Sequence, residues 1–318
     1  MVHGDGAGIT GRRLFPELAS GPFWLWRSDK LDRVVFQLQR SQCYALCLAK
    51  HCVRNSRSEV MAKLSVLAYG VTCYLIFFLT FLYLIGFLAN FGVPKGIDSG
   101  QIVDLASPFV ANLFLIVLFA LQHSVMARPW FKKRWTRLVP PAIERSTYVL
   151  ATSIVLITIY ALWQPIPYTL WKADSDWLQL VLWTIFALGF LIALLSTFMT
   201  DHFDLFGLRQ VYLRFVGRNY QHPPFKVIYL YRLIRHPLYT GMFIGLWATP
   251  HMTMGHFLFA AGLTVYVLVA VGWEEDDLVE ILGERYRAYQ QNVPMFIPRP
   301  GRVQETLRSG EAAPTRMR

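Results

Sequence analysis

Five stretches of this chain contain no Asp, Glu, Lys or Arg, and each is long enough to form a membrane-spanning helix. They cover residues 64–94, 105–127, 146–171, 177–200 and 236–273. A helix needs about 20 apolar residues to cross the hydrocarbon layer, which is about 30 Å thick. The pattern therefore predicts an all-α fold, an integral membrane helical bundle with polar loops between the spans.

The last of these stretches is too long to be one span. Its 38 residues would form a helix of about 57 Å, nearly twice the thickness of the hydrocarbon layer. Pro250 lies near the middle of the stretch, where it favours a turn. We expect a C-terminal helical hairpin with a short leg at about 238–249 and a longer leg at about 255–273. The bundle then has about five to six transmembrane helices.

Composition and charge place this bundle in a membrane and orient it. The chain is 54% hydrophobic and only 16% charged, which excludes an ordinary soluble domain. Residues 127–145 and 201–235 carry six Lys or Arg each, whereas 90–107 and 164–176 carry one each. Because basic loops stay on the cytoplasmic side, both termini are predicted to be cytoplasmic, in a multi-pass protein of a bacterial inner membrane. The net charge of +11 then indicates contact with anionic lipid and not with nucleic acid.

The two ends of the chain differ from the membrane region. Residues 1–60 contain neither a spanning segment nor the apolar core of a signal peptide. We expect a poorly ordered extension there, or a mis-assigned start with Met61 as the functional one. A surface helix at about 31–48 is the alternative. The membrane domain is predicted to cover 61–298, and 299–318 to be a disordered tail.

Familiar motifs for cofactors and metals are missing from the sequence. Cys43, Cys47 and Cys52 match no zinc-binding spacing, so we expect no metal. No Walker loop, GxGxxG or HExxH occurs either. Any nucleotide-like cofactor must therefore be held by the helices and the polar segments between them. The sequence does not predict an oligomeric state.

Polar residues at the helix ends point to a functional site on the cytoplasmic side. Threading the spans brings five clusters to that side: Gln122-His123, Glu144-Arg145, 200–204, Arg235-His236 and Glu274-Glu275. Ionisable groups at a membrane boundary are costly and usually functional. Two alternatives stay open, because His123 could be a packed core histidine and Arg145 could simply follow the positive-inside rule.

The C-terminal part of the chain resembles a known superfamily. The motifs that carry the resemblance are RHPLYTG at 235–241, the pair at 274–275, GERYRAY at 283–289, Val-Pro at 293–294 and Ile-Pro at 297–298. In this order, with a hairpin between them, they are similar to the signature of the isoprenylcysteine carboxyl methyltransferase superfamily of membrane enzymes.

Earlier segments resemble one branch of that superfamily. These segments are QHSVMARPWFKKRW at 122–135, IERSTYVLATS at 143–153 and TDHFDLFGLRQVYL at 200–213. They are similar to the bacterial methanethiol S-methyltransferases, which are related to the NnrU-like proteins. This second resemblance runs from Met61 to Pro298, so residues 1–60 lie outside it.

The resemblance implies an S-adenosylmethionine-dependent enzyme that methylates methanethiol to dimethyl sulfide at the cytoplasmic face. Carried over residue by residue, it assigns the cofactor site to His236, Leu238, Tyr239, Gly241, Glu274, Glu275 and Tyr286. An aromatic-rich pocket suits the sulfonium cation. Much of the catalysis would come from holding the two reactants in line.

A small thiol requires help with deprotonation, because the thiolate is the nucleophile and an alkyl thiol is less acidic than cysteine, whose pKa is about 8.5. Asp201 and His202 are the first candidates for the base, and His123 is the second. Either Arg145 or Arg235 could stabilise the thiolate. We also consider three alternatives: a phospholipid or prenylcysteine methyltransferase, an NADPH-dependent membrane sterol reductase, and a non-catalytic NnrU-like protein of nitrogen-oxide metabolism.

Overall fold

The computed structural model describes residues 25–101 and 106–299, and nearly all side chains from residue 58 onward. The chain divides into two compact units, residues 1–60 and residues 61–318. In the first unit, the backbone is helical from Leu25 onward. The predicted roles of 1–60 as an extension and of 299–318 as a tail stay predictions. Residues 1–24 and 300–318 lie outside the described part.

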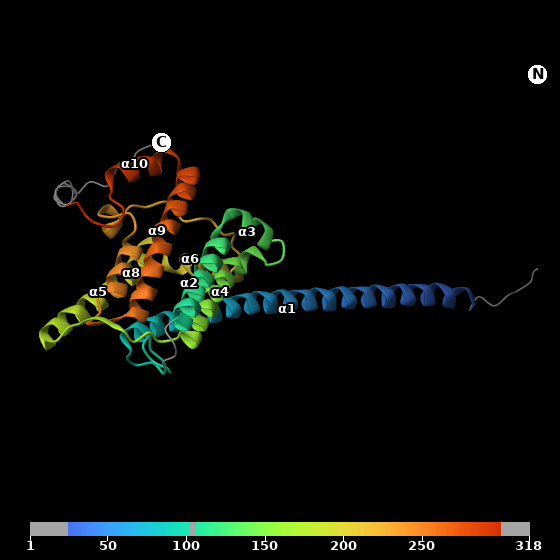
Figure 1. Cartoon of the computed structure of the whole chain (residues 1–318). Helices are drawn as coiled ribbons and strands as arrows, with labels where there is room; N and C mark the ends of the chain where they lie inside the picture. The colour runs from blue at the N-terminus through green and yellow to red at the C-terminus, as the bar shows by residue number, and fades with distance from the viewer. Residues whose placement is uncertain (1–24, 102–105, 300–318) are drawn as a thin grey trace, which may run out of the picture. The chain divides into compact units, whose positions relative to one another are not determined.

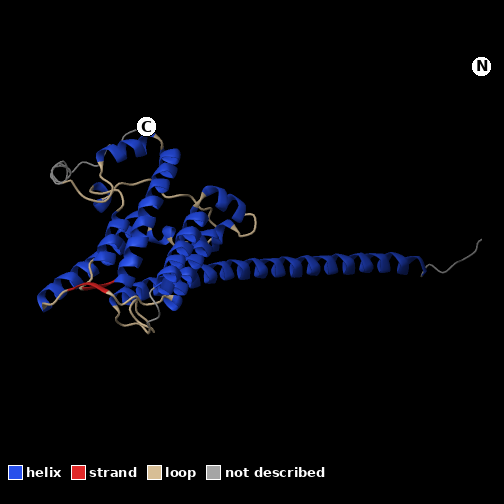
Figure 2. Ribbon diagram, viewed as in Figure 1, coloured by secondary structure: helices blue, strands red, loops and turns tan. Residues whose placement is uncertain are grey.

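The described chain is almost entirely helical (Figure 1, Figure 2). Its helices are α1 (Leu25–Ala89), α2 (Ala106–Ala127), α3 (Pro129–Trp135), α4 (Pro141–Leu162), α5 (Asp176–Thr200), α6 (His202–Leu205), α7 (Leu208–Phe215), α8 (Pro237–Trp247), α9 (Met254–Leu282) and α10 (Glu284–Asn292), with a 3₁₀ turn at Tyr229–Arg232. Within the described residues, five helices are long and apolar enough to cross a membrane: α2, α4, α5, α9 and the Ser58–Ala89 part of α1. The prediction of an all-α, multi-pass membrane bundle is confirmed.

The C-terminal hairpin is formed by α8 and α9. Helix α8 starts at Pro237, whose fixed φ suits the first turn of a helix, and has only 11 residues. At 1.5 Å per residue it extends about 16 Å, half of the hydrocarbon layer. The turn after α8 includes strand β2 (His251–Thr253), which pairs with β1 (Thr169–Lys172) of the α4–α5 connection. Residues 25–101 and 106–299 therefore contain five full spans and one short hairpin leg.

Small residues let α8 pack directly against α5. A Cβ atom on Gly241 would come within 2.5 Å of the Ala193 nitrogen and 2.6 Å of the Gly189 oxygen. A Cβ atom on Gly189 would likewise lie 2.5 Å from the Gly245 nitrogen. Such close backbone approach is the usual way in which membrane helices associate. It fixes the start of α8 relative to the rest of the bundle.

Helix α9 is longer than the sequence predicts. We expected the longer hairpin leg to end near 273, but α9 continues to Leu282. The break falls at Gly283, which has φ of +60°, and α10 follows directly. The acidic residues after 273 mark the membrane boundary but are compatible with helix, whereas a positive φ favours glycine. Glu274 and Glu275 therefore lie inside a continuous helix, which holds their backbone rigidly.

The core that joins the spans is rich in aromatic rings. Phe87, Tyr160, Trp163 and Phe259 are almost fully buried, and their rings pack at centroid distances between 5.1 and 6.3 Å. These side chains come from α1, α4 and α9 and from the residue after α4. The core fixes how the helices face one another, and thereby which polar side chains meet at their ends.

Candidate functional site

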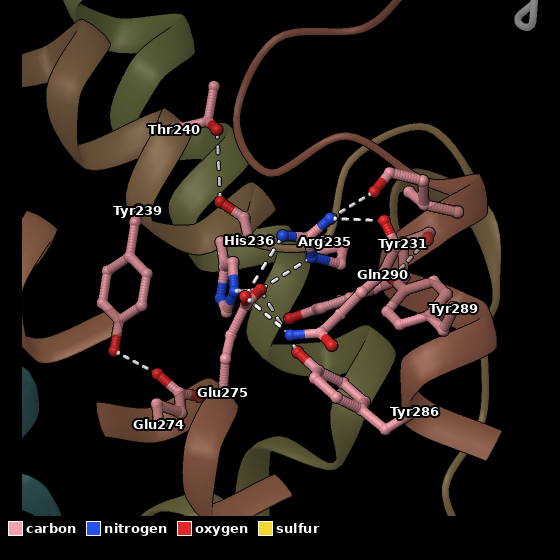
Figure 3. Close-up of polar contacts among 11 residues, drawn as sticks. Tyr231, Arg235, His236, Tyr239, Thr240, Glu274, Glu275, Tyr286, Tyr289 and Gln290 are labelled. Carbon is pink, nitrogen blue, oxygen red and sulfur yellow. Dashed lines mark hydrogen bonds and ion pairs between the residues drawn. The ribbon is translucent and has the colours of Figure 1, made fainter. Parts of the chain in front are cut away.

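Glu275 on α9 is the centre of a buried polar cluster (Figure 3). The Arg235 guanidinium donates from Nε to Glu275 Oε1 at 2.7 Å and from Nη2 to Oε2 at 3.1 Å. Both side chains are about nine-tenths buried, so the ion pair is shielded from water. Such a two-pronged arginine–carboxylate pair is among the strongest polar contacts available to a protein.

Three more side chains fill the remaining positions around Glu275. His236 Nε2 lies 2.9 Å from Oε1, Gln290 donates to Oε2 at 3.0 Å, and the Tyr286 hydroxyl lies 3.4 Å from Oε1. Burial and the nearby carboxylate of Glu275 raise the pKa of Tyr286, which keeps its hydroxyl protonated as a donor. Both Glu275 oxygens are therefore occupied by protein donors.

The cluster connects three segments that are distant in sequence. Arg235 also donates from Nη1 to the carbonyl oxygens of Gln290 and Val293. The backbone nitrogens of Arg235 and His236 bond to the carbonyls of Pro294 and Met295 at 2.9 and 3.1 Å. The start of α8, the end of α9 and the segment after α10 are thus held together by one carboxylate and its donors.

Glu274 has different surroundings from its neighbour. Its Oε2 accepts a hydrogen bond from the Tyr239 hydroxyl at 2.9 Å, and Figure 3 shows this pair lying apart from the Glu275 cluster. Among the described residues, Glu274 forms no ion pair and accepts no second hydrogen bond. It is half-buried and within electrostatic reach of the hydroxyls of Tyr148 and Tyr266. Within the described part of the chain, this carboxylate thus has tyrosine hydroxyls and no cationic group as its neighbours.

His123 on α2 lies in a second polar cluster. Its Nε2 is 2.8 Å from the Tyr148 hydroxyl and its Nδ1 is 3.2 Å from Thr152 Oγ1. The Phe119 ring stacks on the imidazole at 5.4 Å, and the Tyr266 ring meets it edge-on at 6.3 Å. His123 is thus held by contacts to both nitrogens and by rings on two sides.

Arg145 lies beside this cluster. Its guanidinium is 5.1 Å from the centroid of the Tyr148 ring, and its Nε donates to the Leu205 carbonyl at 2.7 Å. It therefore joins α4 to α6 and places a positive charge next to Tyr148 and His123. The end of α2, the start of α4 and the end of α6 meet here.

His202 is enclosed in a third cluster, between α1 and α5. Its Nδ1 is 2.7 Å from Thr197 Oγ1, its Nε2 is 2.8 Å from the Tyr74 hydroxyl, and its ring stacks on Phe198 at 4.1 Å. Burial lowers the pKa of His202, and the nearby Asp201 opposes this shift in part. The ring is therefore held in its neutral form with both nitrogens engaged.

Asp201 holds the turn that precedes α6. Its backbone has φ of +125°, which is uncommon for a non-glycine residue. Oδ1 accepts from the Asp204 nitrogen at 3.1 Å, and Oδ2 is 3.0 Å from Nη1 of Arg209. Asp201 does not contact His202 through a hydrogen bond among the described contacts. A catalytic role for either residue stays a prediction.

Comparison with known proteins assigns the family. A sequence profile described as NnrU protein matches residues 113–297, more than half of the chain. The chain belongs to the NnrU family. Two similar proteins are named methanethiol S-methyltransferase: one from Crocosphaera subtropica, 48% identical over 76% of this chain and 94% of its own length, and one from Mycobacterium tuberculosis, 46% identical over 76% and 99%. A third, of the same name, from a Pseudomonas species is 48% identical over 74% and 91%. No solved structure matches.

The structure brings together most of the residues that the family resemblance singled out. Arg235, His236, Glu275 and Tyr286 form one cluster, and Tyr239 pairs with Glu274. Leu238 is half-buried in the first turn of α8, and Gly241 faces the backbone of α5. Their roles in cofactor binding remain predictions. Among the described residues, no group of three His, Cys, Asp or Glu side chains is arranged to hold a metal.

Several residues of these clusters were not singled out from the sequence, among them Tyr148, Thr152, Tyr266 and Gln290. The spacing of polar residues in the sequence gave some indication of them. Tyr148 and Thr152 are polar residues four positions apart on an apolar span, so they share a helix face. Gln290 follows Tyr286 at the same spacing. The spacing alone does not show that the first pair faces His123 or that the second pair faces Glu275.

The burial of His202 predicts a pH-dependent contribution to stability. The unfolded chain protonates this ring near pH 6.5, whereas the folded protein resists protonation because the pKa is lowered. The contribution is therefore full above about pH 6.5 and is lost as the pH falls toward the lower, folded pKa.

We expect the difference in thermal midpoint between wild type and His202→Asn to shrink between about pH 7.5 and about pH 5.5. His222→Asn, at an exposed position, is the control. A difference for His202→Asn that is constant over this range would contradict the prediction.

Proposed function

We propose that this chain transfers a methyl group from S-adenosylmethionine to methanethiol, giving dimethyl sulfide, at the cytoplasmic face of a bacterial inner membrane. The observation that carries the proposal is its identity of 46 to 48% with methanethiol S-methyltransferases, over three quarters of this chain and more than nine tenths of those enzymes. A match of that extent is far longer than any single motif.

The charge distribution at the site fits S-adenosylmethionine. The Glu274 carboxylate, without a cationic partner among the described residues, lies near Tyr148, Tyr239 and Tyr266. A carboxylate and the faces of aromatic rings both attract a sulfonium cation. Bound there, the cofactor would supply an electrophilic methyl group on a positively charged sulfur.

In this reaction the protein binds the cofactor and keeps the segments around it in place. We assign Glu274 and Tyr239 to direct contact with the cofactor. We assign Glu275, His236 and Tyr286 to holding the surrounding segments in place, because their polar atoms are engaged with one another. Leu238 and Gly241 shape the first turn of α8 beneath this site.

Arg235 and Arg145 differ in the protein groups that already accept hydrogen bonds from them. Arg235 donates to Glu275 and to two carbonyl groups, so its charge is satisfied within the protein. Arg145 has one hydrogen bond to a carbonyl group and otherwise lies over the Tyr148 ring. We therefore favour Arg145 over Arg235 as the cation that stabilises a thiolate.

Headspace gas chromatography of the purified full-length protein with S-adenosylmethionine and methanethiol tests the proposal. We expect dimethyl sulfide in proportion to the amount of protein, with one equivalent of S-adenosylhomocysteine. If S-adenosylmethionine binds but no dimethyl sulfide forms, methanethiol is the wrong acceptor, and lipid and prenylcysteine acceptors become the candidates. If it does not bind, the methyltransferase proposal is wrong.

Replacing Glu274 by Gln should weaken cofactor binding. The variant keeps the shape of the side chain and its hydrogen bond to Tyr239 but removes the negative charge that faces the sulfonium. We expect the Kd for S-adenosylmethionine to rise about tenfold, equivalent to about 1.4 kcal/mol. Asp276→Asn removes one charge from an exposed position two residues along α9 and should leave the Kd unchanged. Isothermal titration calorimetry measures both, and equal Kd values for the two variants would remove Glu274 from the binding site.

A further inference from the structure

Neither imidazole nitrogen of His123 is free to contact a substrate directly. Both of its nitrogens are within hydrogen-bonding distance of a side chain, Nε2 of the Tyr148 hydroxyl and Nδ1 of Thr152. Phe119 stacks on the ring and Tyr266 meets it edge-on. A proton can therefore reach His123 from a bound molecule through the Tyr148 oxygen.

The direction of the hydrogen bond between these two residues follows from their chemistry. A phenol O–H is a stronger donor than an imidazole N–H, and an imidazole nitrogen is a stronger acceptor than a phenol oxygen. The other acceptor near the Tyr148 hydroxyl is the His123 carbonyl at 3.4 Å, against 2.8 Å for Nε2. The tyrosine proton thus points to Nε2, and the proton on the ring sits on Nδ1 and faces Thr152.

The surroundings of Tyr148 connect it to the cofactor site. Tyr148 is within electrostatic reach of Glu274 and of Tyr239, the pair assigned above to the sulfonium. The guanidinium of Arg145, 5.1 Å from its ring centroid, would stabilise negative charge that develops on the phenol oxygen or on a thiolate beside it. Tyr148 thus lies between a proton acceptor, a cation and the proposed methyl donor site.

We propose that Tyr148 and His123 form a proton-accepting pair that deprotonates the acceptor thiol, an inference that rests on the proposed function. The thiol S–H gives its proton to the Tyr148 oxygen while the phenol proton moves to Nε2 of His123. The S–H bond and the original phenol O–H bond break, a new O–H bond and an N–H bond form, and the sulfur keeps the electron pair. As that pair forms the new carbon–sulfur bond, the bond between the methyl group and the sulfonium breaks. After the product leaves, Nε2 returns its proton to the Tyr148 oxygen, and the hydroxyl gives one proton to water.

The cluster around His202 has a similar arrangement but lacks this connection. His202 Nε2 is also 2.8 Å from a tyrosine hydroxyl, that of Tyr74, and its Nδ1 also faces a threonine. Tyr74 is surrounded by the rings of Phe77, Phe78, Phe203 and Phe206. In the described part of the chain, no arginine or lysine lies over its ring and no carboxylate forms a hydrogen bond with its hydroxyl. Tyr74 and His202 are therefore the alternative candidates for a proton-accepting pair in the same molecule.

Three tyrosine-to-phenylalanine variants separate these alternatives. Tyr148→Phe should lower kcat about 100-fold, the lower end of what general base catalysis contributes, and leave the Kd for S-adenosylmethionine within about twofold of wild type. Tyr160→Phe, which removes a buried hydroxyl elsewhere on the same helix, should keep kcat. If Tyr148→Phe turns over at the wild-type rate, the proposal is wrong. If Tyr74→Phe alone loses activity, the base is His202.

A double variant and a more acidic acceptor test the proton transfer itself. His123→Gln can still accept a hydrogen bond but cannot take up a proton, so it should lower kcat as Tyr148→Phe does. Combining both changes should add little, because they remove one relay. With 2,2,2-trifluoroethanethiol, whose fluorines make the thiol more acidic, the deficit of Tyr148→Phe relative to wild type should become smaller. A deficit equal to that with methanethiol would indicate a structural role.

The tautomer provides a readout that does not depend on turnover. In protein with ¹⁵N-labelled histidine, the signal that disappears in His123→Gln should show a protonated Nδ1 and an unprotonated Nε2, and the Nε2 shift should change in Tyr148→Phe. A protonated Nε2 would overturn the inference. Failure of the proposed function looks different, since the wild type itself would then form no dimethyl sulfide.

Discussion

Glu275→Gln should be the most destabilising conservative change at the candidate site. It removes the charge that pairs with Arg235 at 2.7 Å and leaves a guanidinium in a site where about nine tenths of each side chain is buried. Breaking one partner of such a buried pair typically destabilises a protein by about 3 to 5 kcal/mol. We expect a large drop in the thermal midpoint of the detergent-solubilised protein, together with loss of S-adenosylmethionine binding.

The same chemical change at an exposed ion pair is the matched control. Glu284 pairs with Arg287 three residues along α10, and its side chain is 84% exposed. Exposed pairs of this kind contribute at most about 1 kcal/mol, so Glu284→Gln should leave the thermal midpoint nearly unchanged. Equal midpoints for Glu275→Gln and Glu284→Gln would mean that the Glu275 cluster does not hold the fold together.

The two measurements on Glu275→Gln also separate two roles. If Glu275 acts by holding α8 and α10, stability and cofactor binding fall together. If it contacts the cofactor directly, as the family resemblance implies, binding falls while the thermal midpoint stays near that of wild type. The five donor contacts to its carboxylate favour the first outcome.

The sequence predicted the spans because charge is excluded from the hydrocarbon layer by a large free energy, so uncharged windows mark them directly. The hairpin followed from length and Pro250 alone. The end of α9 did not follow, because a change from apolar to acidic residues marks the membrane surface and not the end of the helix. The helix ends at Leu282, and the next residue, Gly283, adopts a positive φ.

The partners of the site residues were less predictable than the site itself. Glu274 and Glu275 are adjacent and chemically identical, yet one has a single hydrogen bond and the other has five donor contacts. Neighbours on a helix point about 100° apart, so the rotation of α9 against α8 and α10 decides which carboxylate is buried. That rotation is set by packing along the whole helix, which the local motif does not contain.

Gly241→Ala should disturb the bundle at the contact between α8 and α5. The added methyl group would lie 2.5 Å from the Ala193 nitrogen and 2.6 Å from the Gly189 oxygen, both backbone atoms that no side-chain rotation can move away. Overpacking of this kind destabilises by about 1 to 3 kcal/mol. Gly272→Ala is the control, because nothing lies within 4 Å of its added methyl group and alanine is the better helix former.

The outcome for Gly241→Ala decides why a glycine follows Tyr239 in this motif. A glycine at this position allows either another backbone or a ligand to come close. The α5 backbone occupies the space next to Gly241, so the thermal midpoint should fall, with a parallel rise in the Kd for S-adenosylmethionine as the start of α8 shifts. A variant that keeps its thermal midpoint but loses cofactor binding would show that the ligand itself lies against Gly241.

Because Gly241 follows Tyr239 by only half a turn, a displacement of α8 moves the Tyr239 hydroxyl away from Glu274. A substitution at Gly241 therefore also changes the contact between Tyr239 and Glu274, although only Tyr239 and Glu274 face the proposed cofactor.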